Sequence, residues 1–524
     1  MKFAHFLGMA GFLFLLSSAW SLPAPSMLLE VNGTPGEFIG RSVMPLADVD
    51  LDGFVDLASG SIASNKVVLF SGKNGQVIWE RFGQNNGDWF GHALGKIPDI
   101  SGDSVPELIV GAPQWNDGLP SGPGYVRVLS GANGSVLFSA SGENSGDIFG
   151  WSVAGMGDLT GDGFPEILVG SPYHDVLAFN EGSVHIFSPK TNALVKKING
   201  LTPSQLGYSL TAFSDFDGDA VPDFAAGAPY GLYNQNPEGK VLVFSGKTFL
   251  PLHTFYGEAA QDWFGWAIAQ IEDATGDHVE DLVVGAPFFN SSNNGRVYVY
   301  DGVSKTLVWK ADGPFASWFG KAVADAGDAD NDGFSDVLAG APLANQFKGM
   351  ARVLSGKNGA VLASLEGPQS NSEFGEAVSG NIDVEGNGVD DFFIATANKN
   401  GLLQAWTFFN GTLKPYGLAC GVNDTPALHI QGIPSPGETV NVQITSANYA
   451  SSTLLIGTSQ AGQPSGNTCT NFVGTPLTVI SLPTNTWIPV SIPSLVSSVP
   501  LYVQAFLGSG SKLEATQPYE IVLK

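Results

Sequence analysis

Apolar and polar positions alternate in short runs along most of the chain, and glycine, proline, asparagine and aspartate separate the runs. Residues 66–70 (KVVLF), 125–129 (YVRVL), 240–244 (KVLVF) and 296–300 (RVYVY) are of this kind, and a polar residue and a glycine follow each of them. An apolar period of two, with turn residues after each run, predicts β-strands rather than helices. The pattern therefore indicates an all-β protein.

One unit built from such strands occurs seven times. Each unit has an acidic stretch that begins eight residues after a glycine, and an apolar strand follows it, usually ending in GAP or GSP. The acidic stretches are DVDLDGFVD (48–56), DISGDSVPE (99–107), DLTGDGFPE (158–166), DFDGDAVPD (215–223), DATGDHVED (273–281), DADNDGFSD (328–336) and DVEGNGVDD (383–391). The glycines are Gly40, Gly91, Gly150, Gly207, Gly265, Gly320 and Gly375.

The length of the unit predicts the architecture. Successive glycines lie between 51 residues (Gly40 to Gly91) and 59 residues (Gly91 to Gly150) apart. Repeats of this size bury their apolar faces against their neighbours, and about 55 residues hold four strands of ordinary length. Four-stranded sheets that stack radially form a propeller. We therefore expect a seven-bladed β-propeller.

The motifs also indicate a family. An aromatic residue precedes most of the glycines, as in DWFG (88–91), DIFG (147–150), DWFG (262–265) and SWFG (317–320). The succession of FG, an acidic DxDxDGxxD loop and GAP resembles the FG-GAP repeats of integrin α-subunits and of many secreted bacterial proteins. The resemblance extends over residues 27–417, and the signatures of WD-type and kelch propellers are missing.

A propeller needs a joint between its first and last blades. Residues 27–31 (MLLEV) stand where each repeat has its outermost strand. We expect this segment to pair with residues 401–408 in the seventh blade. The alternative is that residues 412–417 (TLKPYG) fill the same edge.

Oxygen-rich loops with ligands at alternating positions suit a hard cation such as Ca²⁺. In each acidic loop the side chains at the first, third, fifth and ninth places and the backbone carbonyl at the seventh place supply oxygens, and a glycine at the fourth or sixth place allows the sharp bend. Of the chain's 49 acidic residues, 24 stand at these four side-chain places, so most of the formal charge of −26 would come from metal sites. The resemblance implies Ca²⁺ between the first two strands of each blade, in up to seven sites.

The candidate ligands follow directly from these places. They are Asp48, Asp50, Asp52, Phe54, Asp56, Asp99, Ser101, Asp103, Val105, Glu107, Asp158, Thr160, Asp162, Phe164, Glu166, Asp215, Asp217, Asp219, Val221, Asp223, Asp273, Thr275, Asp277, Val279, Asp281, Asp328, Asp330, Asp332, Phe334, Asp336, Asp383, Glu385, Asn387, Val389 and Asp391. Ser101 and Asn387 predict weaker sites. The loops are not EF-hands, because strands flank them and Ser59, Val110 and Val169 stand at the twelfth place. The alternative is an acidic turn held by Asx hydrogen bonds.

The connections after GAP should emerge on the face opposite to the acidic loops. They are long and aromatic, and exposed aromatic residues mark interfaces. The candidates for partner binding are Trp115, Tyr173, Tyr230, Tyr233, Phe288 and Phe289. The alternative is that these side chains fold back over the blades. We expect Trp89, Trp263 and Trp318 of the WFG motifs to pack between blades.

The two ends of the chain differ from the repeats. Lys2, an apolar run at residues 6–16 and small residues up to Ser21 predict a signal peptide over residues 1–21. Residues 418–524 contain short alternating runs typical of a small β-sandwich. In an exported protein Cys420 and Cys469 are expected to form a disulfide. The protein should be secreted or displayed at a cell surface, with no transmembrane segment in the mature chain.

The charge and the motifs restrict the function. A net charge of −26 disfavours binding to nucleic acid and to anionic membranes. No GxSxG, HExxH or phosphate-binding glycine loop is found, so no catalytic residue is assigned. We expect a calcium-stabilised adhesion module that binds protein or glycan partners. The alternatives are an enzyme that acts on polysaccharides or phospholipids and a structural protein of the cell envelope.

Overall fold

The structure is a computed structural model of the 524-residue chain. It describes residues 25–33, 36–116, 119–175, 179–201, 203–231, 238–386, 388–396 and 401–407. In the C-terminal part it describes eight strands. The predicted signal peptide and both cysteines lie outside these residues.

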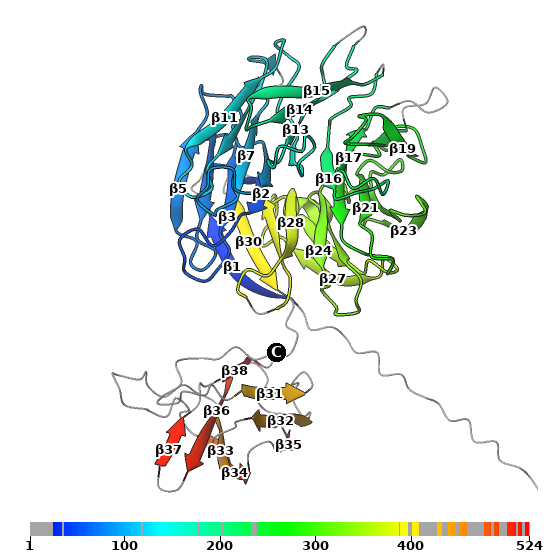
Figure 1. Cartoon of the computed structure of the whole chain (residues 1–524). Helices are drawn as coiled ribbons and strands as arrows, with labels where there is room; N and C mark the ends of the chain where they lie inside the picture. Colours follow the sequence, from blue (N-terminus) through cyan, green and yellow to red (C-terminus); the bar gives the residue numbers. More distant parts are fainter. Residues whose placement is uncertain are drawn as a thin grey trace, which may run out of the picture.

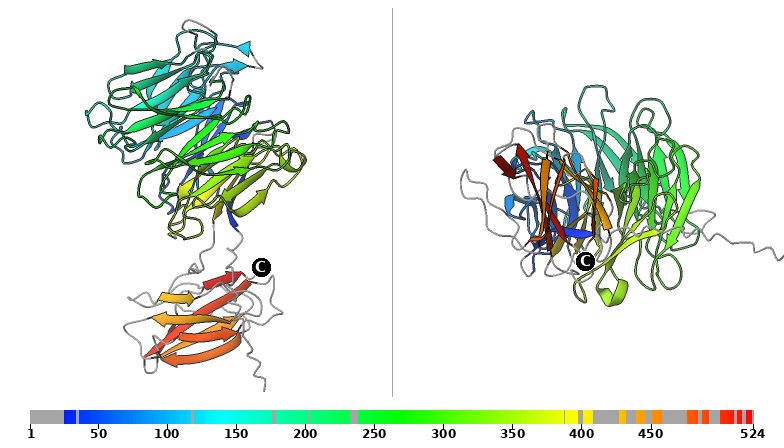
Figure 2. Two further views of the ribbon diagram at one scale, coloured as in Figure 1. Left: turned by 90° about the vertical axis from the view of Figure 1, so that its right-hand side faces the viewer. Right: turned by 90° about the horizontal axis from the view of Figure 1, so that it is seen from below.

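Seven four-stranded antiparallel sheets form a ring, and they follow one another in chain order (Figure 1, Figure 2). The first three blades are β2 (Ile39–Pro45), β3 (Leu57–Ser61), β4 (Lys66–Phe70) and β5 (Val77–Phe82); β6 (Ala93–Ile97), β7 (Glu107–Ala112), β10 (Tyr125–Leu129) and β11 (Val136–Ser141); and β12 (Val153–Gly155), β13 (Ile167–Ser171), β14 (Ser183–Ser188) and β15 (Ala193–Asn199). A two-stranded ribbon, β8 (Trp115–Asn116) and β9 (Leu119–Pro120), extends from blade 2.

The remaining blades repeat this pattern. They are β16 (Leu210–Phe213), β17 (Asp223–Ala228), β18 (Lys240–Phe244) and β19 (Pro251–Tyr256); β20 (Ala267–Ile271), β21 (Asp281–Ala286), β22 (Arg296–Tyr300) and β23 (Leu307–Asp312); β24 (Val323–Gly327), β25 (Asp336–Ala341), β26 (Met350–Leu354) and β27 (Val361–Glu366); and β28 (Ala377–Ile382), β29 (Asp391–Thr396), β30 (Leu402–Thr407) and β1 (Ser26–Asn32). A short turn, α1 (Ala344–Phe347), follows the GAP of blade 6. The predicted seven-bladed propeller is confirmed.

The N-terminal strand closes the ring. β1 pairs antiparallel with β30, so that Glu30 lies opposite Gln404 and Val31 lies opposite Leu403. The amide of Gln404 also donates a hydrogen bond of 2.8 Å to the carboxylate of Glu30. The predicted pairing of residues 27–31 with the seventh blade is confirmed, while the alternative segment 412–417 lies outside the described residues.

The core is divided among the contacts between blades. Seven apolar clusters each draw buried side chains from two neighbouring blades, and together they account for every blade-to-blade contact of the ring. The phenylalanines of the FG motifs are buried in these contacts, with at most 1% of their surface exposed. They are Phe90, Phe149, Phe264, Phe319 and Phe374.

The tryptophans of the WFG motifs are only half-buried. Trp263 lies 5.0 Å from Tyr230 and Trp318 lies 4.8 Å from Phe288, measured between ring centroids. Each of these contacts joins one blade to the next, as expected. The phenylalanine that follows each tryptophan, however, fills the interior of the contact, and the tryptophans remain at its edge.

The described C-terminal strands form two antiparallel sheets. One contains β31 (Ala427–Gln431), β32 (Thr439–Thr445) and β35 (Trp487–Ser491). The other contains β34 (Pro476–Pro483), β33 (Ser451–Gly457), β36 (Pro500–Ser509), β37 (Lys512–Ala515) and β38 (Tyr519–Val522). Two sheets are what the β-sandwich prediction requires. Among the residues that the structure describes, no helix is long and apolar enough to cross a membrane.

Candidate functional site

The acidic loops occupy one end of the propeller. In every blade the loop connects the first strand to the second, as between β2 and β3. Because successive strands of a blade are antiparallel, the connections from the second strand to the third and from each blade to the next lie at the other end. We call these two ends the acidic face and the aromatic face.

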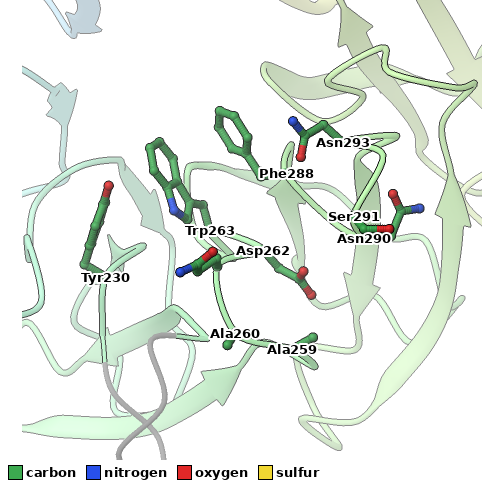
Figure 3. A pocket seen from close by; sticks show the side chains of 10 residues that line it. Tyr230, Ala259, Ala260, Asp262, Trp263, Phe288, Asn290, Ser291 and Asn293 are labelled. Atoms are coloured by element: carbon green, nitrogen blue, oxygen red, sulfur yellow. The ribbon is translucent and has the colours of Figure 1, made fainter.

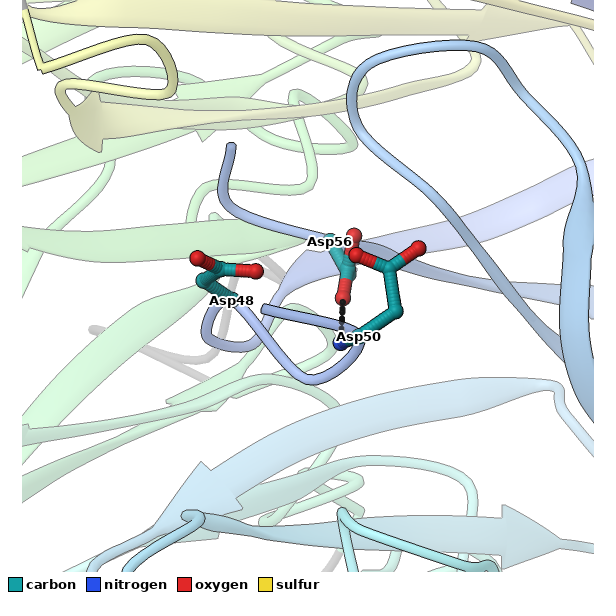
Figure 4. Close-up of side chains that lie close together, drawn as sticks. All are labelled: Asp48, Asp50 and Asp56. Carbon is teal, nitrogen blue, oxygen red and sulfur yellow. Dashed lines mark hydrogen bonds between the residues drawn. The ribbon is translucent and has the colours of Figure 1, made fainter. Parts of the chain in front are cut away.

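Four of the seven loops bring three carboxylates together. In each of these loops one oxygen from each of the three residues lies within 4.8 Å of the other two. The groups are Asp48, Asp50 and Asp56; Asp158, Asp162 and Glu166; Asp215, Asp217 and Asp223; and Asp328, Asp330 and Asp332. Figure 4 shows the first group, in which the backbone N–H of Asp50 also donates to Asp56. No such group is found among the described residues of the loops that begin at Asp99, Asp273 and Asp383, and Asn387 is not described.

The first carboxylate of each loop organises the backbone around it. Asp48 accepts hydrogen bonds from the backbone N–H groups of Asp52 and Gly53 at 3.0 and 2.9 Å. Equivalent bonds from backbone N–H groups lower the pKa of Asp99 and Asp158, since they favour the charged form. The Asx turns expected from the alternative interpretation are therefore present, and they hold the remaining oxygens in position.

The ninth carboxylate of each loop is fully buried in all seven blades. Its oxygens accept the N–H of the residue at the second place, as in the 2.7 Å bond from Val49 to Asp56. In five blades they also accept the N–H of the glycine after the third strand. The donors are Gly72, Gly131, Gly246, Gly302 and Gly356. Blade 3 has Pro189 at that place, and proline has no N–H to donate.

Burial raises the pKa of these ninth carboxylates. The pKa of Asp336 rises to about 8, and those of Asp281 and Asp391 rise to about 7. Charged side chains nearby give little compensation: Lys357 lies 3.8 Å from Asp332, and its side chain is half exposed. A bound cation would favour the charged form of these ninth carboxylates and would neutralise the charge of the other carboxylates in each loop.

A second constellation lies at the centre of the ring, and the sequence analysis missed it. The residue directly after each FG glycine, on the first strand or just before it, contacts the corresponding residue of the next blade. The seven residues are Arg41, His92, Trp151, Tyr208, Trp266, Lys321 and Glu376. We call them the central ring. Their constant position after the glycine is the signal that could have revealed them.

Ion pairs and aromatic contacts link the central ring. Glu376 accepts hydrogen bonds of 2.7 Å from both Arg41 and Lys321. Arg41 also donates to Nε2 of His92 at 2.8 Å, so the proton of that imidazole is on Nδ1, which donates to a backbone carbonyl. Burial, together with the neighbouring Arg41 and Lys321, lowers the pKa of His92 well below its usual value.

The aromatic members complete the circle. The centroid distances are 4.3 Å from His92 to Trp151, 5.3 Å from Trp151 to Tyr208 and 4.5 Å from Tyr208 to Trp266. The ammonium of Lys321 lies 5.7 Å from the Trp266 ring. The central ring therefore ties all seven blades together near the propeller axis.

Comparisons with known proteins agree with this geometry. The FG-GAP repeat family model matches residues 149–187, 206–244 and 264–300, in blades 3 to 5. This chain carries an integrin-α-like FG-GAP propeller. It is 32% identical to integrin alpha-V of Gallus gallus over 211 residues. This aligned stretch covers 36% of this chain and 20% of that protein.

Two further relatives give the same result. The FG-GAP propeller is 32% identical to integrin alpha-5 of Xenopus laevis over 212 residues, which is 36% of this chain and 20% of that protein. It is 30% identical to integrin alpha-4 of Xenopus laevis over 233 residues, which is 41% of this chain and 22% of that protein. The chain thus spans about a fifth of the length of the curated relatives it matches.

On the aromatic face of the FG-GAP propeller, four of the six predicted partner-binding residues take part in two groups of aromatic contacts. Trp115 and Tyr173 meet edge to face at 5.7 Å across neighbouring blades, and Tyr230 and Phe288 both contact Trp263, at 5.0 and 4.3 Å. These side chains are half-buried, so each keeps part of its surface accessible.

Phe289 differs from the others. It packs against the apolar cluster between blades 4 and 5, and the guanidinium of Arg296 covers its ring at 3.5 Å. Phe289 therefore folds back over its blade, as the alternative interpretation describes. Tyr233 lies outside the described residues.

Proposed function

We propose that this chain is a secreted or cell-surface binding module whose FG-GAP propeller is stabilised by Ca²⁺ and whose aromatic face binds protein or glycan partners. The observation that carries the proposal is the convergence of three carboxylates in each of four loops. In this proposal the propeller occupies residues 27–417, and a separate β-domain occupies residues 418–524. A disulfide between Cys420 and Cys469 stabilises the β-domain. No catalytic role is assigned.

Calcium fits the donor set of the acidic loops. Carboxylate and backbone carbonyl oxygens are the ligands that Ca²⁺ prefers, and six to eight of them are needed. Each converged group supplies three carboxylates, and further loop oxygens and water complete the shell. Ca²⁺ would neutralise the loop carboxylates, because the lysines beside the loops are partly exposed and neutralise them little. The four converged loops are the strongest sites, and the loops with Ser101 and Asn387 are the weakest.

Chelation tests the proposed calcium sites. A ligand that binds only the folded state stabilises it by about 2.7 kcal/mol for each site when its free concentration is 100 times Kd. We therefore expect the melting temperature of the full chain, followed by circular dichroism, to fall when EDTA replaces Ca²⁺. Equal melting temperatures in the two buffers would remove calcium from the proposal.

A matched pair of variants tests which loops contribute to the calcium-dependent stability. Asp332→Asn alters the fifth place of a loop with a converged group, and Asp103→Asn alters the same place of a loop without one. Both carboxylates accept similar backbone hydrogen bonds, of 3.1 and 2.9 Å. We expect Asp332→Asn to reduce the calcium-dependent part of the melting temperature more than Asp103→Asn does.

The aromatic face is favoured as the partner-binding surface because it exposes apolar side chains. Leu119, Phe179, Phe315 and Phe347 all lie on its connections, and between 49% and 78% of each side chain is exposed. Large exposed apolar groups on one face mark interaction sites. Binding of the full chain to matrix proteins and glycans is therefore expected to weaken in Trp115→Ala and Tyr230→Ala. Phe82→Ala, on the outer strand β5, serves as the control that should bind like the parent.

A further inference from the structure

A cavity of about 670 Å³ opens on the aromatic face between blades 4 and 5. Its lining comes from three connections: the one after β17, the one between β19 and β20, and the one between β21 and β22. They include Tyr230, Asp262, Trp263, Phe288, Asn290 and Asn293 (Figure 3). We call it the blade 4–5 cavity.

One wall of the cavity is aromatic. The centroid of the Trp263 ring lies 5.0 Å from that of Tyr230 and 4.3 Å from that of Phe288, and the rings are tilted by 45° and 52°. Trp266 stacks on Trp263 from the central ring at 5.0 Å, and Trp318 supports Phe288. Because Trp263 contacts both of the other rings, the three rings form one apolar wall.

The rest of the lining is polar, and some of its donors make no hydrogen bond to protein. Oδ1 of Asn290 accepts backbone N–H groups at 2.9 and 3.4 Å, which fixes its side chain. Within the described part of the chain, the side-chain N–H and O–H groups of Gln261, Ser291 and Asn293 donate no hydrogen bond to protein. Figure 3 shows the carboxylate of Asp262 between the aromatic rings and Asn290.

Asp262 has a buried oxygen without a partner. Only 3% of the residue is exposed, and among the described residues Oδ2 has no hydrogen-bond donor. Asp88 stands at the same place of the DWFG motif in blade 2, where Gln114 and Tyr125 donate to its two oxygens at 3.0 and 3.1 Å. Phe288 takes the place of Gln114 in blade 5. A buried acceptor is rarely left unpaired, so this carboxylate points to a ligand that donates.

The negative charge of the cavity disfavours an anionic ligand. Burial raises the pKa of Asp262 to about 6, so the group is still charged at neutral pH. Arg296, the nearby cation, is already paired with Asp312 and with Glu258. An anionic ligand would therefore meet a negatively charged carboxylate in a protein of net charge −26.

We propose that the blade 4–5 cavity binds an uncharged pyranose unit of a neutral glycan. A pyranose ring has an apolar C–H face, which matches the Trp263–Phe288 wall, and hydroxyl groups, which match the amide groups of the lining and the unpaired oxygen of Asp262. Pockets that combine an apolar wall with a few fixed polar groups are typical ligand sites. The inference rests on the proposed function and specifies the class of partner for this face.

Glycan binding by the full chain tests the inference. An array of neutral, amino-bearing and uronic or sialic acid oligosaccharides, followed by calorimetry on the best neutral one, should show selectivity for neutral sugars. Trp263→Ala removes the centre of the aromatic wall and should weaken that binding at least about tenfold. Trp89→Ala is the matched control, because Trp89 has the same place in its repeat and a similar φ of 58° but lines no part of this cavity. It should bind like the parent.

Asp262→Asn tests the selectivity separately. The variant keeps the size of the side chain and removes its charge, so binding of acidic glycans should increase relative to neutral ones. Acidic glycans that bind the parent as well as neutral ones, or unchanged neutral-glycan binding in Trp263→Ala, would overturn the inference. Binding of matrix proteins without any glycan would overturn the inference and leave the proposed function standing. Binding to neither would overturn both.

Discussion

The buried histidines of blade 3 show how a single residue can set a pH dependence. His174 donates from Nδ1 to Asp147 at 2.8 Å, whereas Nδ1 of His185 has no hydrogen-bond partner among the described residues. Burial, with smaller contributions from Lys197 and His174, lowers the pKa of His185 to about 4. His185 is therefore neutral in the folded protein under conditions in which an exposed histidine is charged.

This lowered pKa predicts a loss of stability in acid. The unfolded chain takes up the proton near pH 6.5 and the folded protein only near pH 4, so the stabilising contribution is present above pH 6.5 and is lost as the pH falls toward 4. The difference corresponds to about 3 kcal/mol. The unfolding free energy of His185→Gln should therefore fall less than that of the parent between pH 7 and 4, as measured by urea denaturation. Parallel pH profiles would contradict this assignment.

At the scale of the element, the FG and GAP motifs of neighbouring blades contact each other. The GAP glycine of one blade lies against the backbone carbonyl of the FG glycine in the next. A Cβ built on Gly285 would lie 2.0 Å from the carbonyl oxygen of Gly320, and one on Gly340 would lie 2.0 Å from that of Gly375. Blade 7 has Ala395 at this place. The two motifs are thus the two sides of one close backbone contact.

The contact predicts a large effect for a small change. Gly285→Ala places a methyl group where the Gly320 carbonyl stands, and backbone cannot move aside as a flexible side chain could. Blades 5 and 6 would have to separate, which we expect to cost about 1–3 kcal/mol, as overpacking does elsewhere. Chemical denaturation of the full chain measures this cost. An unchanged unfolding free energy would show that the close approach is not required.

At the scale of the whole molecule, closure of the ring depends on three features that join blade 7 to blade 1. β1 completes the sheet of blade 7. An apolar cluster that includes Val43 and Phe393 fills the contact between the two blades. The Arg41–Glu376 ion pair joins the two blades in the central ring. All three unite segments more than 300 residues apart.

Removing the charge of Glu376 tests the third feature. Glu376→Gln leaves Arg41 and Lys321 without a counter-charge in a site where the Glu376 side chain is only 11% exposed. Breaking a buried pair in this way costs about 3–5 kcal/mol. Glu143→Gln is the control, because it breaks an exposed pair with Lys197 that should contribute less than about 1 kcal/mol. Equal effects of the two variants on urea unfolding would contradict this role of the central ring.

The sequence by itself determined the strands, the number of blades and the position of the acidic loops, whereas the structure chose β1 over the alternative segment as the closing strand. Each follows from local spacing, such as the eight residues from Gly91 to Asp99, because strand periodicity and turn length are short-range properties. The tertiary structure alone decided which loops bring their carboxylates together. It also placed Phe90 rather than Trp89 inside a blade contact, joined Arg41 to Glu376 and left one oxygen of Asp262 unpaired. The packing of Phe90 and the Arg41–Glu376 pair depend on contacts between residues from different blades, and such distances are fixed only when the ring has closed.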